Sequence, residues 1–123
     1  MSLEIIAHRG YSAIAPENTI AAFAAAIENG ANSIEFDVQL SSDGEFVIIH
    51  DGTLERTTNG SGKVAEKTLE ELKELDAGSW FNPKFAWEKI PTLREGLDAI
   101  KNLDKFAYPE VKGSENWTDR DVD

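Results

Sequence analysis

Several carboxylates and histidines of this sequence stand in or at the end of short apolar runs, where a buried sheet would favour Val or Ile. Glu35 and Asp37 alternate with apolar residues in SIEFDVQL, Glu110 lies in FAYPEVKG, and His8 and His50 close two other apolar runs. Three carboxylates gathered in one pocket would repel strongly unless a cation or protons neutralised them. Because ligation by oxygen alone favours Ca²⁺ or Mg²⁺ over Zn²⁺, these residues predict a site for one hard divalent cation.

Two histidines and two basic residues complete a set that could act on a phosphate ester. An unperturbed imidazole titrates near pH 6.5, so His8 and His50 suit the roles of general base and general acid near neutral pH. Arg9 and Lys112 could bind an anionic group. Together with the cation they would stabilise charge on phosphoryl oxygens. The combination predicts metal-assisted attack on a phosphodiester.

The elements that must position these residues begin with LEIIAH (3–8), a short apolar run typical of a buried strand. NTIAAFAAAIENG (18–30) follows, and its residues at helical spacing are Ile20, Phe23, Ala24 and Ile27. This spacing predicts an amphipathic helix that stops at Asn29-Gly30.

SIEFDVQL (33–40) and EFVIIHD (45–51) flank the turn dipeptide Asp43-Gly44 and predict a β-hairpin. The first strand has an apolar face with Ile34, Phe36, Val38 and Leu40, and a polar face with Ser33, Glu35, Asp37 and Gln39. With the turn centred on that dipeptide, Asp37 and His50 lie roughly opposite each other, with Cβ atoms about 5 Å apart. The hairpin is thus expected to gather Glu35, Asp37 and His50.

The composition changes between Gly52 and Pro91, which we call the 52–91 segment, to Thr, Gly, Asn, Lys and Glu. Thr68 and Glu71 form a capping-box pattern that predicts one short helix. Four aromatic residues lie in the same segment: Trp80, Phe81, Phe85 and Trp87. Such aromatic density favours a packed lid or a ligand wall over a flexible linker. We therefore interpret the segment as an inserted region lying over the site.

A second capping-box pattern, Thr92 to Glu95, predicts a helix with Leu93, Leu97 and Ile100 on one face. FAYPEVKG (106–113) then predicts a strand with Glu110 and Lys112 on the same side. Helices between strands imply crossover connections and hence a parallel α/β fold. A complete (β/α)8 barrel takes roughly 200 to 400 residues, so this chain could hold about three of its eight strands. Either it is part of a longer polypeptide or a partner supplies the rest, which leaves self-association open.

The composition excludes several other classes of protein. The 123 residues include 23 acidic and 12 basic ones, for a formal net charge of −11, which argues against binding to nucleic acid. No run of 18 apolar residues predicts a transmembrane helix, and the N-terminus lacks the pattern of a signal peptide. These features predict a cytoplasmic protein, with a periplasmic or secreted form left open. Zero cysteines remove thiolate nucleophiles and Cys-type zinc sites.

The series of motifs resembles the glycerophosphodiester phosphodiesterases, relatives of the phosphatidylinositol-specific phospholipases C. The matching residues occur in the family's order across residues 6–112 and are His8-Arg9-Gly10, Pro16-Glu17-Asn18-Thr19, Glu35-Phe36-Asp37, His50-Asp51 and Glu110-Val111-Lys112. No single motif is diagnostic, but the series is highly specific.

The resemblance implies that residues 1–123 form one partial domain, the N-terminal portion of a (β/α)8 barrel, with 52–91 inserted within it. It implies metal ligation by Glu35, Asp37 and Glu110, and acid and base roles for His8 and His50. The substrate is then a small glycerophosphodiester, whose own glycerol hydroxyl attacks phosphorus, expels the head-group alcohol and gives a cyclic phosphate that water opens. On this reading His8 is the base toward the hydroxyl and His50 the acid toward the leaving alcohol, with the reverse order left open.

Two alternatives accompany this hypothesis. A truncated barrel could bind a divalent ion or a phosphate without turnover, and a chain of this length alone would have weak or absent activity because reacting groups misplaced by about 1 Å can cost around 100-fold. A lipid-directed phospholipase D-like barrel is disfavoured, because such enzymes usually carry disulfide-forming cysteines. Glu17 and Asn18 are interpreted as helix-capping and loop-fixing residues rather than catalysts.

Overall fold

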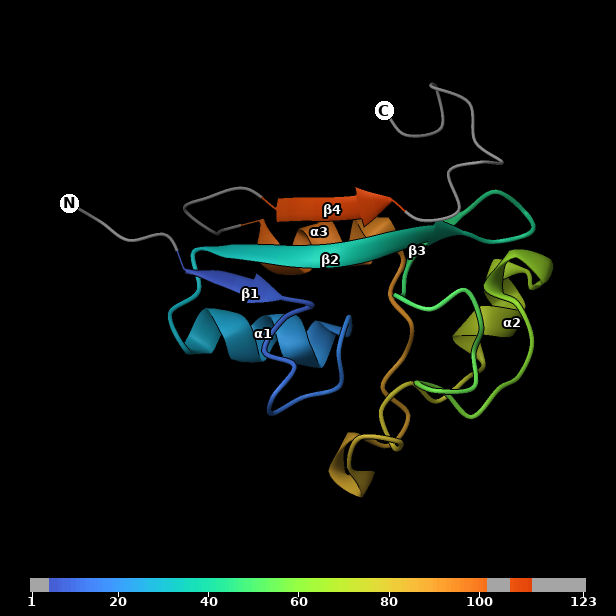
Figure 1. Ribbon diagram of the computed structural model, residues 1–123, viewed down its shortest axis with the longest axis horizontal. Helices are drawn as coiled ribbons and strands as arrows, with labels where there is room; N and C mark the ends of the chain where they lie inside the picture. Colours follow the sequence, from blue (N-terminus) through green and yellow to red (C-terminus); the bar gives the residue numbers. More distant parts are fainter. Residues whose placement is uncertain (1–4, 102–106, 112–123) are drawn as a thin grey trace.

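The computed structural model describes residues 5–101 in full and the backbone of residues 107–111. The elements, in chain order, are β1 (Ile6–His8), α1 (Ile20–Glu28), β2 (Ser33–Leu40), β3 (Phe46–Ile48), the 3-10 helix η1 (Val64–Glu66), α2 (Leu69–Lys73), the 3-10 helix η2 (Pro83–Phe85), α3 (Leu93–Ile100) and β4 (Ala107–Val111). Figure 1 shows one sheet with β2 at its centre, α1 beneath β1, and α3 behind β2 and β4. Among the described residues, no helix is long and apolar enough to cross a lipid bilayer.

The sheet confirms the predicted parallel α/β arrangement. β1 and β4 both run parallel to β2, and β3 pairs with it antiparallel. Val38 pairs with Ile48 of β3 and with Val111 of β4, so those two strands lie on opposite edges of β2. Residues 34 and 35 pair with both β1 and β4. It follows that β1 and β3 share one edge of β2, and that the chain leaving β1 meets the chain leaving β3.

The hairpin register differs from the prediction by one residue. Val38 pairs with Ile48, so the residue opposite Asp37 is Ile49, whose N–H donates to the Asp37 carbonyl at 3.0 Å. The reason is the turn, since residues 41–45 form a five-residue connection with Ser41 N–H donating to the Glu45 carbonyl. A shift of one residue exchanges the faces of a strand. The expectation that Asp37 and His50 are cross-strand neighbours is therefore wrong.

The main core lies on the apolar face of β2, as predicted. Its buried residues come from α1, β2, β3 and α3 and are Phe23, Ala26, Ile34, Phe36, Val38, Ile48 and Ile100. The predicted buried face of α1 is wrong in part, because the helix buries Ala22, Phe23 and Ala26 while Ile27 is 38% exposed. Alanine allows a helix backbone to approach a sheet closely, so the contact is made by small residues that a pattern of large ones does not reveal.

Both capping boxes are confirmed, and α3 shows a similar departure in its buried face. Thr68 and Thr92 accept hydrogen bonds from the N–H groups of Glu71 and Glu95, whose side chains accept from the capping backbone in return. On α3, Ile100 is buried as predicted and Leu93 packs against the core. Leu97, however, is 42% exposed. The buried position one residue earlier is Gly96, where the helix approaches Ile48.

The 52–91 segment has a core of its own, which supports the prediction of a packed segment. The residues buried in it are Val47, Ile49, Leu54, Val64, Leu72, Ala77 and Ile90. Val47 and Ile49 flank Ile48, which belongs to the main core, so successive residues of β3 and the position directly after it pack into two different cores. Figure 1 shows the segment extending from α2, near the end toward which β2 runs, down to a short helical turn at the bottom of the view. The predicted aromatic residues are partly solvent-facing, because Trp80 is 39% and Trp87 60% exposed.

The turn after β1 depends on glycine at position 10. Gly10 has a φ of +79°, and a Cβ placed on it would lie 2.7 Å from the backbone carbonyl carbon of Ala22 in α1. The neighbouring Tyr11 N–H donates to the Ala22 carbonyl at 2.9 Å. Any larger residue at position 10 would therefore push the turn away from the helix.

We expect Gly10→Ala to lower the free energy of unfolding by about 2 to 4 kcal/mol, because a left-handed backbone conformation and an overpacked contact are both penalised. The measurement is urea denaturation followed by circular dichroism. Gly44→Ala is the matched control, since Gly44 also has a positive φ of +83° but would place no Cβ contact within 4 Å. Equal losses in the two variants would contradict the steric part of this explanation.

Candidate active site

The two chain segments that follow β1 and β3 meet on the same edge of β2. The Arg9 N–H donates to the Glu35 carbonyl, and the Ile49 N–H donates to the Asp37 carbonyl. Glu35 and Asp37 alternate on β2, so both lie on the face opposite the main core. That face is enclosed at Asp37, which is 2% exposed, and more open at Glu35, whose side chain is 39% exposed. The polar residues of β2 thus face the place where the ends of β1 and β3 come together.

His8 and Glu35 form the more open part of this site. His8 Nε2 lies 3.3 Å from Glu35 Oε1, and their side chains are 57% and 39% exposed. The two residues pair directly across the parallel strands β1 and β2. Cross-strand pairing therefore places His8 next to the first carboxylate of β2.

Asp37 is held by two residues of the loop between β1 and α1. Asn18 Nδ2 donates to Asp37 Oδ2 at 2.8 Å, and Arg9 Nε lies 3.3 Å from the same oxygen. The Asn18 N–H donates to the Arg9 carbonyl at 2.9 Å, and both residues have a φ of 58°. Left-handed conformations at residues other than glycine persist where the surrounding structure enforces them, often at functional sites. The loop is thus shaped around the buried carboxylate.

The predicted role of Glu17 and Asn18 as helix caps is wrong in part. Thr19 is the N-cap of α1, with its hydroxyl oxygen accepting from the Ala22 N–H at 3.2 Å. Asn18 is 3% exposed and contacts Asp37, while Glu17 contacts basic residues. Both residues therefore belong to the site. Their positions just before the start of a helix led to their interpretation as caps.

Gln39, the last polar residue of the β2 face, fixes the chain as it leaves β3. Its Nε2 donates to the carbonyls of Ile49, His50 and Asp51, at 3.2, 3.0 and 2.6 Å. The backbone of His50 is therefore positioned by the face that carries Glu35 and Asp37. The hairpin does bring His50 toward these carboxylates, through a side chain that bonds the backbone rather than through cross-strand pairing.

The ring of His50 is oriented by the residue that follows it. His50 Nδ1 lies 2.9 Å from Asp51 Oδ1. An ionised carboxylate has no proton to donate, so Nδ1 carries the hydrogen of this bond. In the neutral ring, Nε2 then carries no hydrogen and can take up a proton, which the protonated ring can deliver from the same atom.

Arg56 of the 52–91 segment binds both the Asp51 carboxylate and the Glu17 carboxylate. Its Nε and Nη2 donate to the two oxygens of Asp51 at 2.9 and 3.0 Å, and its Nη1 and Nη2 donate to those of Glu17 at 3.0 and 2.9 Å. The Arg56 guanidinium, aided by His50, lowers the pKa of Asp51 to about 2. Asp51, and then Glu17, raise the pKa of Arg56.

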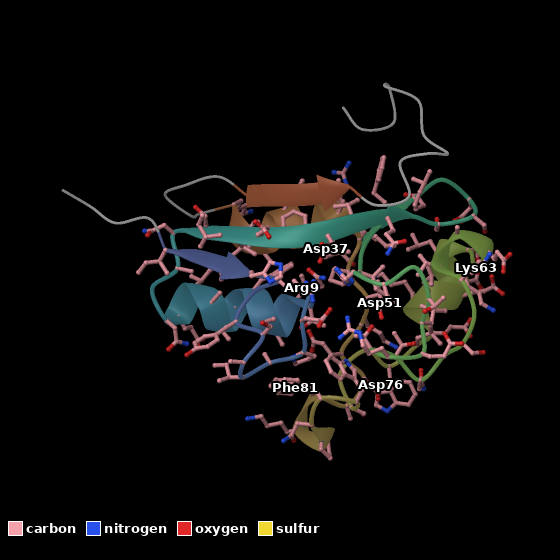
Figure 2. All side chains as sticks on the ribbon, in the orientation of Figure 1. Arg9, Asp37, Asp51, Lys63, Asp76 and Phe81 are labelled. Atoms are coloured by element: carbon pink, nitrogen blue, oxygen red, sulfur yellow. The ribbon has the colours of Figure 1, made fainter. Side chains whose placement is uncertain are left out.

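These contacts join the two halves of the site into one chain of alternating charges. Arg9 Nη1 donates to Glu17 Oε2 at 3.5 Å, so the series runs from Asp37 through Arg9, Glu17 and Arg56 to Asp51. Figure 2 shows Arg9 beside Asp37, with Asp51 on the side of the 52–91 segment. Arg56 and Glu17 are 39 residues apart in sequence. A pattern read along the sequence carries no signal for such a pair.

The described part of the site holds two of the three predicted metal ligands. Glu35 and Asp37 lie on one face of β2, and Asp37 is the register partner of Glu110 across β4. Directly paired residues share a face of a sheet, so position 110 belongs to the face of positions 35 and 37. Within residues 5–101, no three His, Cys, Asp or Glu side chains are grouped to hold a metal ion. The side chain of Glu110, and Lys112 altogether, lie outside the described residues.

The α/β sheet thus brings together a histidine at the end of β1, an arginine of the loop that follows β1, and two carboxylates of β2. The chain belongs to the glycerophosphoryl diester phosphodiesterase family, whose model matches residues 8–121. This match confirms the family resemblance that the sequence motifs indicated.

Individual relatives match the same region. A glycerophosphodiester phosphodiesterase of Caldanaerobacter subterraneus subsp. tengcongensis is 55% identical over 112 residues, which are 91% of this chain and 46% of that protein. A crystal structure of glycerophosphodiester phosphodiesterase from Agrobacterium tumefaciens superimposes with a TM-score of 0.86 at 42% identity, covering 89% of this chain and 47% of that one. An Oleispira antarctica phosphodiesterase in complex with the product sn-glycerol-3-phosphate gives 0.86 at 45% identity, covering 89% and 44%. The chain therefore spans less than half the length of these relatives.

Proposed function

We propose that the protein carrying this chain hydrolyses glycerophosphodiesters to an alcohol and glycerol 3-phosphate. The observation that supports this most directly is the meeting of the β1 and β3 chain ends on one edge of β2, with His8 next to Glu35 and the His50 backbone held by Gln39. The relative from Oleispira antarctica was solved with sn-glycerol-3-phosphate as its product. Its similarity to this chain supports the same product here.

We propose that Glu35, Asp37 and Glu110 hold one hard divalent cation, Ca²⁺ or Mg²⁺. The support is the shared face of these positions and their all-oxygen chemistry. When bound, the cation would supply a positive charge that stabilises the developing charge on the phosphoryl oxygens. The chain's own residues must do the rest.

In this proposal the two histidines transfer the protons. His8 takes a proton from the glycerol hydroxyl of the substrate as that oxygen attacks phosphorus, and His50 gives a proton from Nε2 to the departing head-group alcohol. The bond from phosphorus to the head group breaks, a cyclic phosphate forms, and water then opens it with the proton transfers reversed. Arg9 and Lys112 bind the phosphate oxygens. The assignment of acid and base can also be the reverse.

The rest of the architecture follows the family. We propose that residues 1–123 are the N-terminal portion of a (β/α)8 barrel, in which β1, β2 and β4 are three of the eight strands and residues 52–91 are inserted. The supports are the parallel order of these strands and the TM-scores of 0.86 with two relatives. Function at the carboxyl ends of barrel strands is the rule for this fold.

The reaction is tested by the products released from glycerophosphocholine. We expect choline and glycerol 3-phosphate, detected by enzymatic choline assay and by phosphorus NMR. Because the glycerol hydroxyl is the attacking group, an analogue that lacks the hydroxyl next to the phosphate should bind without turnover. Release of glycerol and phosphocholine would mean cleavage of the other ester bond. Binding of glycerophosphocholine and of the analogue without any product would favour the truncated, non-enzymatic reading. Turnover of an intact phospholipid in preference to glycerophosphocholine would favour the phospholipase D-like reading.

A further inference from the structure

We propose that Arg56 is a positioning residue, which holds the Asp51 carboxylate so that it binds Nδ1 of His50 and leaves Nε2 free for proton transfer. The inference rests on the proposed acid-base role of His50 for its catalytic consequence. It gives the 52–91 segment a role in the reaction beyond that of covering the site. The observation that supports it is that Arg56 forms bidentate hydrogen bonds with two carboxylates at once.

The donors of Arg56 are almost fully committed to protein oxygens. A guanidinium has five N–H donors in a fixed plane, and four of those of Arg56 serve Asp51 and Glu17. A phosphate bound at this place would have to compete with two carboxylates already in bidentate geometry. Arg56 therefore differs from Arg9, whose contacts with Asp37 and Glu17 are longer, at 3.3 and 3.5 Å. The geometry points to holding the site rather than to binding substrate.

The backbone on either side of Arg56 is anchored in the second core. Leu54 is 1% exposed, and Thr57 and Thr58 are 6% and 7% exposed. The Thr58 N–H and hydroxyl both donate to the Leu54 carbonyl, at 3.1 and 2.6 Å. An exposed ion pair on a mobile side chain contributes little. The Arg56 side chain is 45% exposed, but its backbone lies in a turn fixed at both ends and its guanidinium is bound by two carboxylates, so it can act as a support.

Glu17 completes the support from the opposite side of the site. Its side chain is 10% exposed and lies in the loop that also carries Arg9 and Asn18. Nη2 of Arg56 donates to both carboxylates, so these two negative groups are close neighbours with a cation between them. Without the Arg56 guanidinium, the Asp51 and Glu17 carboxylates would repel each other. Asp51 would turn away, and the bond to His50 Nδ1 would weaken.

The test is the imidazole tautomer of His50, read from ¹⁵N chemical shifts at a pH where the ring is neutral. A His50→Gln sample identifies the resonances. In the unchanged protein we expect the form with hydrogen on Nδ1 to predominate, because Asp51 accepts from it. In Arg56→Gln we expect a mixture of both tautomers and a kcat lower by about 10- to 100-fold, as for other displaced catalytic groups. KM should change little.

Arg56→Lys and Arg94→Gln complete the design. Lysine keeps the charge but cannot form two forks, so we expect an intermediate tautomer ratio and kcat, and this variant decides the matter should Arg56→Gln fail to fold. Arg94 is an exposed residue of α3, and its variant should match the unchanged protein in both readouts. A folded Arg56→Gln with an unchanged tautomer overturns the proposal, whatever its rate.

The two proposals fail separately. A change in tautomer without any hydrolysis of glycerophosphodiesters would support the positioning role of Arg56 and contradict the proposed reaction. Hydrolysis together with an unchanged His50 tautomer in Arg56→Gln would support the proposed reaction and contradict the positioning role. Arg56 would then be only a surface ion-pair partner.

Discussion

His8→Asn and His50→Asn are each expected to lower kcat for glycerophosphodiester hydrolysis by a factor of about 10² to 10⁴, the usual contribution of a positioned acid or base. Asparagine keeps a polar group near the imidazole position but cannot transfer a proton. Since neither histidine is a proposed metal ligand, the affinity for the cation should stay nearly unchanged. Steady-state kinetics and calorimetric titration of Ca²⁺ or Mg²⁺ measure the two quantities. Normal rates in both variants would remove the acid-base mechanism.

A change of leaving group separates the two histidines. An ester of glycerol phosphate with p-nitrophenol needs no proton on its leaving oxygen, because p-nitrophenolate is already a good leaving group. We therefore expect this substrate to restore much of the rate of the variant that lacks the acid, which is His50→Asn in our assignment, and little of the rate of the variant that lacks the base. The opposite result would exchange the roles of His8 and His50.

Chelation of divalent cations and Asp37→Asn are each expected to lower kcat/KM by at least about 100-fold, since a bound cation stabilises the transition state by several kcal/mol. Asp37 is the more informative of the two described carboxylates because it is 2% exposed and contacts both Arg9 and Asn18. Replacing it would also leave Arg9 beside a neutral amide. Cation affinity is measured by titration calorimetry, and folding by circular dichroism.

Glu45→Gln is the control for Asp37→Asn. Glu45 is an exposed carboxylate in the turn between β2 and β3, so its removal changes the net charge equally without entering the site. We expect it to bind the cation and turn over substrate normally. Turnover that persists after thorough chelation, or full cation affinity in a folded Asp37→Asn, would contradict the metal proposal.

Local patterns predicted the elements well because their causes are local. Each capping box joins residues three apart, Thr68 to Glu71 and Thr92 to Glu95, and both are present. The alternation in residues 33–40 likewise identified the face of β2 that enters the core. Contacts within one turn of a helix or along one strand are determined by nearby side chains.

Features set by distant parts of the chain were not predictable in this way. The hairpin register follows from the turn at 41–45, and a one-residue error there placed His50 opposite Asp37. The faces of α1 and α3 follow from where alanine and glycine permit close approach. The pairing of Arg56 with Glu17 joins residues from separate regions, so motif reading found His50-Asp51 without the guanidinium that holds it.

The division of β3 between two cores has a consequence for how this protein can be altered. Ile48 contributes to the sheet and helices, whereas Val47 and Ile49 contribute to the packing of the 52–91 segment. The three-residue strand β3, with Ile49 directly after it, thus packs into both cores. Transplanting the segment onto another protein would require a recipient strand with branched apolar residues on both sides, and shortening it would expose that strand to water and favour aggregation.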